Sequence, residues 1–201
     1  MPQKTLCELD RDYDVAFYDQ AIRWQGPAAF NVATAIIDCF CPGRIIDVGC
    51  GPGTYMVQFR LLGVDVFGVE GSSEGVRRCR AQGLPVERMD LTNKIAFNRK
   101  FDVAICFEVA EHLPRSASDT LVASLVGLSS TIVFTAAEPG QGGTGHMNEQ
   151  PLSYWDNKFL RHSFSSNFEQ QEYLKSRFSK DPLSNPWLIS NLRVYQFRSN
   201  T

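Results

Sequence analysis

The sequence has no long hydrophobic run among its 201 residues. Its N-terminus is polar and charged, without the apolar core of a signal peptide, and no segment reaches the length that crosses a bilayer. Internal repeats and low-complexity tracts are also lacking. We therefore expect a cytoplasmic protein with no membrane partner, folded as a single domain with a substantial core over residues 1–201.

An excess of positive charge is also lacking. Twenty basic and 22 acidic residues give a net charge of −2, so bulk electrostatic attraction to nucleic acid is not indicated. Arg77, Arg78 and Arg80 form a local basic run, which we interpret as a solvated helix face. The charge balance favours a small-molecule partner over nucleic acid, and nothing in the sequence indicates the oligomeric state.

The cysteines form no Cys-x-x-Cys pair and no regular framework, which argues against a disulfide scaffold. Cys39 and Cys41 are a weak metal pattern, and burial as small apolar side chains explains them better. We expect reduced thiols throughout. The six cysteines are Cys7, Cys39, Cys41, Cys50, Cys79 and Cys106.

Residues 44–55 read Arg-Ile-Ile-Asp-Val-Gly-Cys-Gly-Pro-Gly-Thr-Tyr. An apolar strand is followed at once by three alternating glycines, Gly49, Gly51 and Gly53, and a helical pattern begins at Thr54. Glycine lets the backbone turn sharply and approach a ligand closely. The segment therefore predicts a strand–loop–helix cradle for a cofactor.

The residues around this loop narrow the choice of cofactor. The dinucleotide fingerprint is Gly-x-Gly-x-x-Gly, and here Thr54 stands where its third glycine would be. Asp47 would repel a pyrophosphate but attract an ammonium group. Glu70 follows a second apolar run, where a carboxylate can accept hydrogen bonds from both ribose hydroxyls. A ligand with an amino group, a ribose and no phosphate, such as S-adenosylmethionine, satisfies these demands better than NAD, so an NAD-dependent oxidoreductase fits poorly.

Further segments follow the glycine loop in order: Val69-Glu70-Gly71-Ser72, Met89-Asp90-Leu91, residues 101–108, and Glu111-His112-Leu113-Pro114. Together with the loop they resemble the ordered motifs of the class I S-adenosylmethionine-dependent methyltransferases over residues 44–138. The resemblance implies that the loop binds the methionine end of the cofactor, that Glu70 binds the ribose, and that Asp90 and Leu91 flank the adenine. It implies a cofactor site made of Asp47, Gly49, Cys50, Gly51, Gly53, Glu70, Gly71, Ser72, Asp90, Leu91, Phe107 and Glu108, with no special role for the Cys50 side chain.

The alternation of strands and helices predicts an α/β protein with a mostly parallel sheet covered on both faces. The resemblance implies a three-layer α/β/α Rossmann-like methyltransferase fold with an antiparallel strand near the C-terminus. We expect N-terminal helices over the site (1–43), a cofactor-binding core (44–138) and an acceptor-side region (139–201). The expected strands are 44–48, 64–69, 85–88, 101–106, 130–135 and 187–197, with residues 161–167 as the only, short, candidate for an additional strand; the expected helices are 12–24, 28–40, 54–62, 73–82, 116–127, 151–162 and 167–178, with none over 91–100.

Methyl transfer requires in-line alignment and exclusion of water more than reactive side chains. A hydroxyl acceptor would also need a general base, and histidine is the usual choice. Of the three histidines, His112 and His146 follow the fourth and fifth strands at the edge where ligands bind, whereas His162 has no such placement. We predict His146 and His112 as catalytic, although His112 can also be read as a turn cap and the loop of His146 as a flexible surface excursion.

Other residues near this edge have two interpretations each. Asn148 and Gln150 follow the glycine-rich loop of His146 and can bind acceptor hydroxyls. The aromatic side chains of Tyr13, Tyr18 and Trp24 can cover the cofactor, but core packing is the better explanation for them.

Glu108, Glu111, His112 and His146 also suggest a divalent metal site, because the i, i+3, i+4 spacing brings the first three to one face. This arrangement resembles that of the small-RNA 3′-end methyltransferases. We do not favour a metal cofactor, since Glu-x-x-Glu-His is common in this fold and the chain lacks basic character.

Three functions remain open at this point. The favoured one is S-adenosylmethionine-dependent O-methylation of a small hydroxylated metabolite or sugar-like acceptor, with a histidine base and with S-adenosylhomocysteine as product. A metal-assisted RNA 3′-end 2′-O-methyltransferase is second. A subunit that binds S-adenosylmethionine without catalysing transfer is third.

Overall fold

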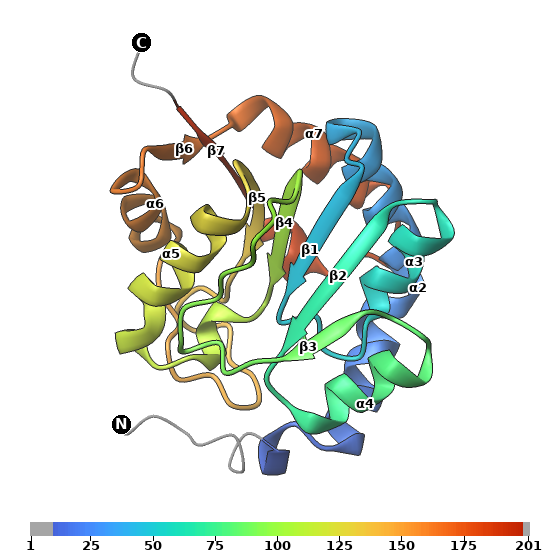
Figure 1. Cartoon of the computed structure of the whole chain (residues 1–201). Coiled ribbons are helices and arrows are strands. Elements are labelled where there is room, and N and C mark those ends of the chain that lie inside the picture. Colours follow the sequence, from blue (N-terminus) through green and yellow to red (C-terminus); the bar gives the residue numbers. More distant parts are fainter. Residues whose placement is uncertain (1–9, 199–201) are drawn as a thin grey trace.

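The computed structural model describes residues 10–198 and contains a seven-stranded sheet with helices on both faces (Figure 1). The strand order is β3-β2-β1-β4-β5-β7-β6. β1 to β5 are parallel, and β7 runs antiparallel to both of its neighbours. The strands are β1 Arg44–Val48, β2 Asp65–Glu70, β3 Val86–Arg88, β4 Val103–Phe107, β5 Thr131–Thr135, β6 Phe164–Ser166 and β7 Arg193–Phe197. The predicted mostly parallel α/β/α fold is confirmed.

Two hydrophobic cores lie on the two faces of the sheet, because alternate strand residues point in opposite directions. Ile45 of β1 packs in the first core, and Ile46, the next residue, packs in the second. Figure 1 shows α2, α3 and α7 on one side of the sheet and α5 and α6 on the other. The helices are α2 Val15–Phe40, α3 Thr54–Leu61, α4 Ser73–Ala81, α5 Ser118–Leu128, α6 Leu152–Leu160, α7 Phe168–Ser179 and α8 Pro186–Ser190, with 3-10 turns η1 Ala110–His112 and η2 Arg115–Ala117.

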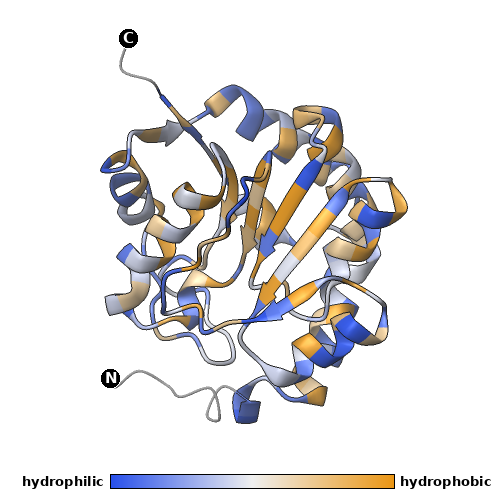
Figure 2. Ribbon diagram, viewed as in Figure 1, coloured by the Kyte–Doolittle hydropathy of each residue, from blue (hydrophilic) through white to orange (hydrophobic). Residues whose placement is uncertain are grey.

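The central strands are apolar because both of their faces are covered. All five residues of β4 are buried, and Figure 2 shows apolar colouring through the central strands with hydrophilic residues gathered on the outer helices and loops. No helix of residues 10–198 combines the length and apolarity needed to cross a membrane.

The N-terminal region differs from the sequence prediction, which placed two helices there. One helix, α2, runs without interruption through Gly26 and Pro27, where we expected a break. Proline inside a helix removes a hydrogen bond and costs about 3 kcal/mol. Burial of the following helical residues against the first core offsets this cost, and the helix therefore continues. These buried residues are Ala28, Ala29, Val32, Ala33, Ala35 and Ile36.

The C-terminal region also differs from the sequence prediction. Residues 187–197 were expected to form one strand, but the strand begins only at Arg193. The residues before it form the short helix α8, because Asn185 caps its N-terminus by accepting a hydrogen bond from the Trp187 amide and Pro186 suits its first turn. The short strand expected within 161–167 is present as β6, and 91–100 contains no helix, as predicted.

Candidate functional site

A cavity of about 420 Å³ lies at the carboxyl ends of the central strands, the edge where ligands bind in open α/β sheets. The glycine loop after β1, Glu70 at the end of β2 and Glu108 after β4 all line it. The N-terminal half of α2 and the loop that carries His146 also line it. These five segments, far apart in the sequence, therefore form one site.

The glycine loop has the conformation that its sequence predicted. Gly49, Gly51 and Gly53 have φ angles of 78°, 53° and 80°, in the left-handed region that favours glycine. A Cβ atom on Gly49 would collide with the side chain of Val109, and one on Gly53 would collide with Leu84. The loop therefore needs glycine both for its turns and for close packing.

Glu70 lies buried at the centre of a hydrogen-bond network. Its carboxylate accepts hydrogen bonds from the amides of Gly51 and Ser72, both at 2.8 Å, and from the hydroxyl of Tyr18 at 3.2 Å. Burial raises the pKa of Glu70, and these donors oppose that effect. Oε2 accepts only the Gly51 bond within residues 10–198, so it can still accept one from a ribose hydroxyl.

Asp47 lines the same cavity and is only 3% exposed. Its Oδ2 atom has no hydrogen-bond partner among the described residues. Burial, followed by repulsion from Glu70, raises the pKa of Asp47 to about 8. A buried carboxylate without a donor is stabilised by a cation, so this position fits the ammonium group of S-adenosylmethionine.

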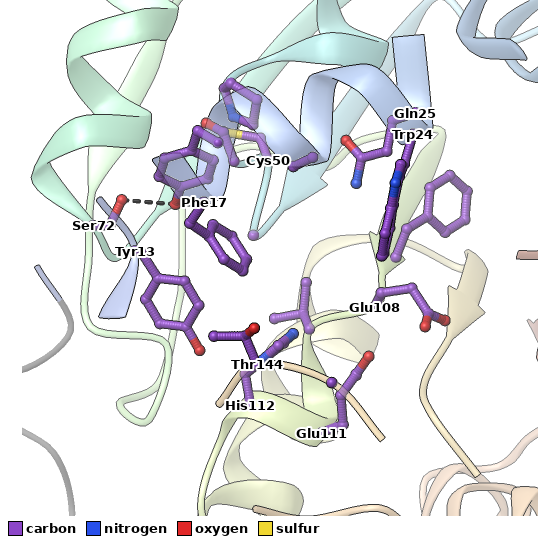
Figure 3. A pocket seen from close by; sticks show the side chains of 18 of the residues that line it. Tyr13, Phe17, Trp24, Gln25, Cys50, Ser72, Glu108, Glu111, His112 and Thr144 are labelled. Carbon is purple, nitrogen blue, oxygen red and sulfur yellow. Dashed lines mark hydrogen bonds between the residues drawn. The ribbon is translucent and has the colours of Figure 1, made fainter. Parts of the chain in front are cut away.

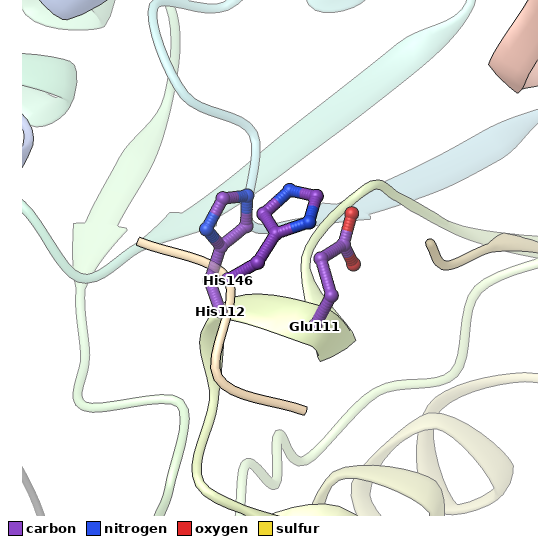
Figure 4. A group of neighbouring side chains, drawn as sticks. All are labelled: Glu111, His112 and His146. Carbon is purple, nitrogen blue, oxygen red and sulfur yellow. The ribbon is translucent and has the colours of Figure 1, made fainter. Parts of the chain in front are cut away.

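Glu111, His112 and His146 converge at another part of the cavity (Figure 4). One possible ligand atom from each lies within 4.8 Å of the others. Glu111 comes from η1 and is fully buried, and within residues 10–198 neither of its carboxylate oxygens accepts a hydrogen bond of normal geometry. Burial, and then the charge of Glu108, raises the pKa of Glu111 well above its usual range.

His146 is oriented by a carboxylate three residues further along the chain. Its Nδ1 atom lies 2.8 Å from Oε1 of Glu149, whose carboxylate also accepts hydrogen bonds from the amides of Gly140 and Gly142 at 2.8 and 2.7 Å. These donors lower the pKa of Glu149, the His146 bond having the largest effect. The ionised carboxylate requires a proton on Nδ1, so the neutral imidazole keeps Nε2 as its acceptor.

Glu108 does not join the group formed by Glu111, His112 and His146. Its carboxylate accepts hydrogen bonds from Gln141 at 2.9 Å and from Asn191 at 3.1 Å. Asn191 also donates to Oε1 of Gln141 at 2.9 Å. Three of the four residues suggested as metal ligands therefore come together, while Glu108 connects the His146 loop to the end of α8.

Most of the cofactor residues implied by the resemblance line the cavity, but Gly53, Gly71 and Asp90 do not. The Asp90 carboxylate accepts hydrogen bonds from the amide and hydroxyl of Thr92, as in a turn. Those that line the cavity are Asp47, Gly49, Cys50, Gly51, Glu70, Ser72, Leu91, Phe107 and Glu108.

Asn148 and Gln150, the suggested acceptor-binding residues, are also not among the lining residues. The Asn148 amide donates to the carbonyl of Ala110 and to the hydroxyl of Ser118, and its side-chain oxygen accepts from Gln150. Their amides are thus used in fixing the loop onto η1. Cys7 lies outside the described residues.

The cavity is also lined by residues that the sequence prediction either missed or assigned to the core. Tyr13, Tyr18 and Trp24 line the cavity, although core packing was the favoured interpretation; Figure 3 shows Tyr13 and Trp24 there. Gln141, Asn185 and Trp187 also line it. The i, i+3 spacing of His146 and Glu149 was the one available signal for their pairing. No local feature of the sequence indicated that Trp187 lines the cavity, and the sequence prediction placed it in a strand.

Comparison with known proteins agrees with this geometry. A family model described as "Methyltransferase domain" matches residues 26–126, half of the chain. The chain therefore belongs to this methyltransferase family, and its fold and ordered motifs place it among the class I S-adenosylmethionine-dependent methyltransferases.

Curated relatives share part of the sequence. A ubiquinone biosynthesis O-methyltransferase from Alkalilimnicola ehrlichii is 27% identical over 164 residues, which cover 71% of this chain and 62% of the relative. The Paraburkholderia phymatum enzyme of the same name is 35% identical over 78 residues, covering 35% and 34%. The chain thus spans less than two thirds of the length of these relatives.

Solved structures share the fold over nearly the whole chain. The magnesium protoporphyrin IX methyltransferase from Synechocystis PCC 6803 with bound S-adenosylmethionine has a TM-score of 0.65 at 15% identity, covering 96% of this chain and 97% of its own. The sugar N-methyltransferase KedS8 from Streptoalloteichus has a TM-score of 0.67 at 14% identity, covering 92% and 94%.

Proposed function

We propose that this methyltransferase transfers the methyl group of S-adenosylmethionine to a hydroxyl of a small acceptor, with His146 as the general base. The observation that carries the base assignment is the 2.8 Å contact between His146 Nδ1 and Glu149, on a histidine that lines the cavity. A carboxylate that fixes the tautomer of an imidazole and stabilises its protonated form is the arrangement that general-base catalysis needs.

The glycine loop and two buried carboxylates would hold the cofactor. Asp47 would pair with its ammonium group, Oε2 of Glu70 would accept a hydrogen bond from its ribose, and Leu91 would contact its adenine. The bound cofactor supplies a methyl group already activated by the sulfonium. The protein's contribution is to align the acceptor oxygen with that methyl and to exclude water.

The acceptor hydroxyl donates its proton to Nε2 of His146 as the oxygen attacks. The proton remains on the imidazole, where Glu149 stabilises the resulting positive charge. The unpartnered carboxylate of Glu111 can accept a hydrogen bond from a neighbouring hydroxyl of the acceptor. His112 packs edge-on against both Tyr13 and His146 and keeps the base in place.

Calorimetry tests the cofactor assignment directly. S-adenosylmethionine and S-adenosylhomocysteine should bind, whereas NAD should show no comparable heat. Asp47→Asn should weaken binding of S-adenosylmethionine, because it removes the partner of the ammonium group. NAD binding as tight as that of S-adenosylmethionine would overturn the assignment.

The second candidate is metal-assisted methylation, including that of an RNA 3′ end. One observation favours it: the possible ligand atoms of Glu111, His112 and His146 lie within 4.8 Å of one another, and this donor set suits a divalent ion. In this case His146 would be a ligand and not the base. The favoured mechanism predicts unchanged turnover after dialysis against a chelator. A loss of turnover that added Mg²⁺, Mn²⁺ or Zn²⁺ restores would establish the metal-assisted alternative.

A further inference from the structure

The cavity contains carboxylates but no lysine or arginine. Among the described residues that line it, Asp47, Glu70, Glu108 and Glu111 are acidic and none is Lys or Arg. Carboxylate and phosphate groups are usually bound by Arg or Lys. Burying an anion without such a partner is costly, because it loses its hydration. An anionic acceptor would find no Lys or Arg among these lining residues to form an ion pair.

Two tryptophans line the same cavity and are still about half exposed to solvent. Trp24 of α2 is 59% exposed and Trp187 of α8 is 46% exposed. In Figure 3 Trp24 and Gln25 lie on the side of the cavity near Glu108, away from Ser72 and Tyr13. Single exposed apolar side chains are common, but two indoles from distant segments on one cavity offer flat apolar surface at its opening.

Fixed polar contacts support this part of the cavity. Asn185 caps α8 through the Trp187 amide at 2.9 Å. Asn191 at the other end of α8 bonds to Glu108 and Gln141. The amide side chains of Gln20, Gln25 and Asn185 also line the cavity, and amides bind uncharged hydroxyls.

We propose that the acceptor is an uncharged ring compound whose flat face lies against Trp24 and Trp187 while its hydroxyl reaches His146. Indole presents a flat, rigid surface that stacks on a ring at low conformational cost. The same surface suits an aromatic ring with hydroxyls or the face of a sugar, and the lack of Lys or Arg among the described lining residues disfavours the carboxylated or phosphorylated forms of either. This inference rests on the proposed function for the position of the reacting hydroxyl.

Intrinsic fluorescence tests the proposal without requiring turnover. Trp155, the remaining tryptophan, is fully buried, so acrylamide quenching reports mainly on Trp24 and Trp187. The protein saturated with S-adenosylhomocysteine is titrated with catechol and methyl glucoside, and separately with 3,4-dihydroxybenzoate and methyl glucuronide as their anionic counterparts. One of the neutral rings should protect the tryptophans from quenching, and its anionic counterpart should not. Which neutral ring protects distinguishes an aromatic acceptor from a sugar.

Variants test whether Trp24 and Trp187 bind the ring. Trp24→Ala and Trp187→Ala should each weaken binding of the protective ring roughly three- to tenfold, and Trp24→Phe should restore part of it. Phe168→Ala is the matched control, because Phe168 is 71% exposed and does not line the cavity. Gln25→Arg should increase binding of the anionic counterpart, since it introduces the missing cation.

The proposal is overturned if the anionic probes protect as well as the neutral ones, or if neither ring protects at any soluble concentration. Failure of the proposed function is distinguishable. Full activity after replacement of His146 would refute that function while leaving the quenching result unaffected.

Discussion

In the proposed mechanism, activation of the acceptor depends on His146 and Glu149. The Nδ1 contact with Glu149 fixes the tautomer, and the same carboxylate binds two backbone amides of the glycine-rich loop. The side chain of Glu149 therefore orients the base and also holds the loop that carries it. Substitution can separate these two effects.

Replacing His146 with Gln should lower kcat by about two to four orders of magnitude, the usual contribution of a general base. Binding of S-adenosylmethionine should not change, because the cofactor residues Asp47 and Glu70 lie on other segments. Steady-state kinetics with labelled cofactor and calorimetry measure the two quantities. Normal turnover in a double replacement of His112 and His146 would show that neither histidine is the general base.

Glu149→Gln should lower kcat less than loss of the imidazole does. The amide can still accept a hydrogen bond from Nδ1, but it cannot stabilise the imidazolium. Steady-state kinetics at saturating acceptor measure this difference. A kcat equal to that of the wild type would show that Glu149 only shapes the loop.

The glycine loop is the element in which sequence and structure agree most closely. Its conformation depends on three positive φ angles and on contact with Val109 and Leu84. The positive φ angles depend on residues within the loop, whereas Val109 and Leu84 are distant in the sequence and are brought to it by the fold.

Gly49→Ala tests this dependence. The added methyl group meets Val109 and adds strain at a φ of 78°, so cofactor affinity should fall at least tenfold while the protein remains folded. Gly63→Ala is the matched control, because Gly63 has a φ of 84° but no atom within 4 Å of the added carbon. Calorimetry and thermal unfolding compare the two variants. Equal cofactor affinity in both would contradict the cradle.

Helix α2 continues past two residues that by themselves favour a helix end. Gly26 and Pro27 predict a helix end, yet the helix continues because its second half is buried against α3 and the sheet. As a consequence, the first half reaches the cavity, where Tyr18 bonds to Glu70 and Trp24 lines the opening.

The whole molecule concentrates buried carboxyl groups at one edge of the sheet. Burial raises the pKa values of Asp47, Glu70 and Glu111, and Asp47 reaches about 8 from an ordinary value of 3.8. Between these two values the folded state binds more protons than the unfolded state. Stability must therefore fall as the pH rises through that window, by up to about 1.4 kcal/mol per pH unit for each such group.

The free energy of unfolding of the cofactor-free protein should accordingly be greater at pH 6 than at pH 8. S-adenosylmethionine should raise the melting temperature more at pH 8, because its ammonium group pairs with ionised Asp47. Denaturant unfolding and thermal melts at the two pH values measure both effects. Asp47→Asn should reduce both, and a wild-type stability that increases from pH 6 to pH 8 would contradict this account.

The sequence by itself determined the class of cofactor and the glycine loop after β1. The spacing of Asp47, Gly49, Gly51 and Gly53 specifies a strand, a left-handed loop and a helix start. These are interactions between near neighbours in the chain, so they can be read from order and residue type. The parallel strands were predicted for the same reason, because burial on both faces leaves continuous apolar runs.

Only the tertiary structure brought together the remaining residues that line the cavity. The contact of Tyr18 with Glu70, the bonds of Asn191 to Glu108 and Gln141, and the presence of Trp24 and Trp187 on one cavity all join segments far apart in the sequence. Such contacts depend on how α2 and α8 pack against the sheet, and that packing is set by the summed burial of whole elements. No spacing within the chain encodes it.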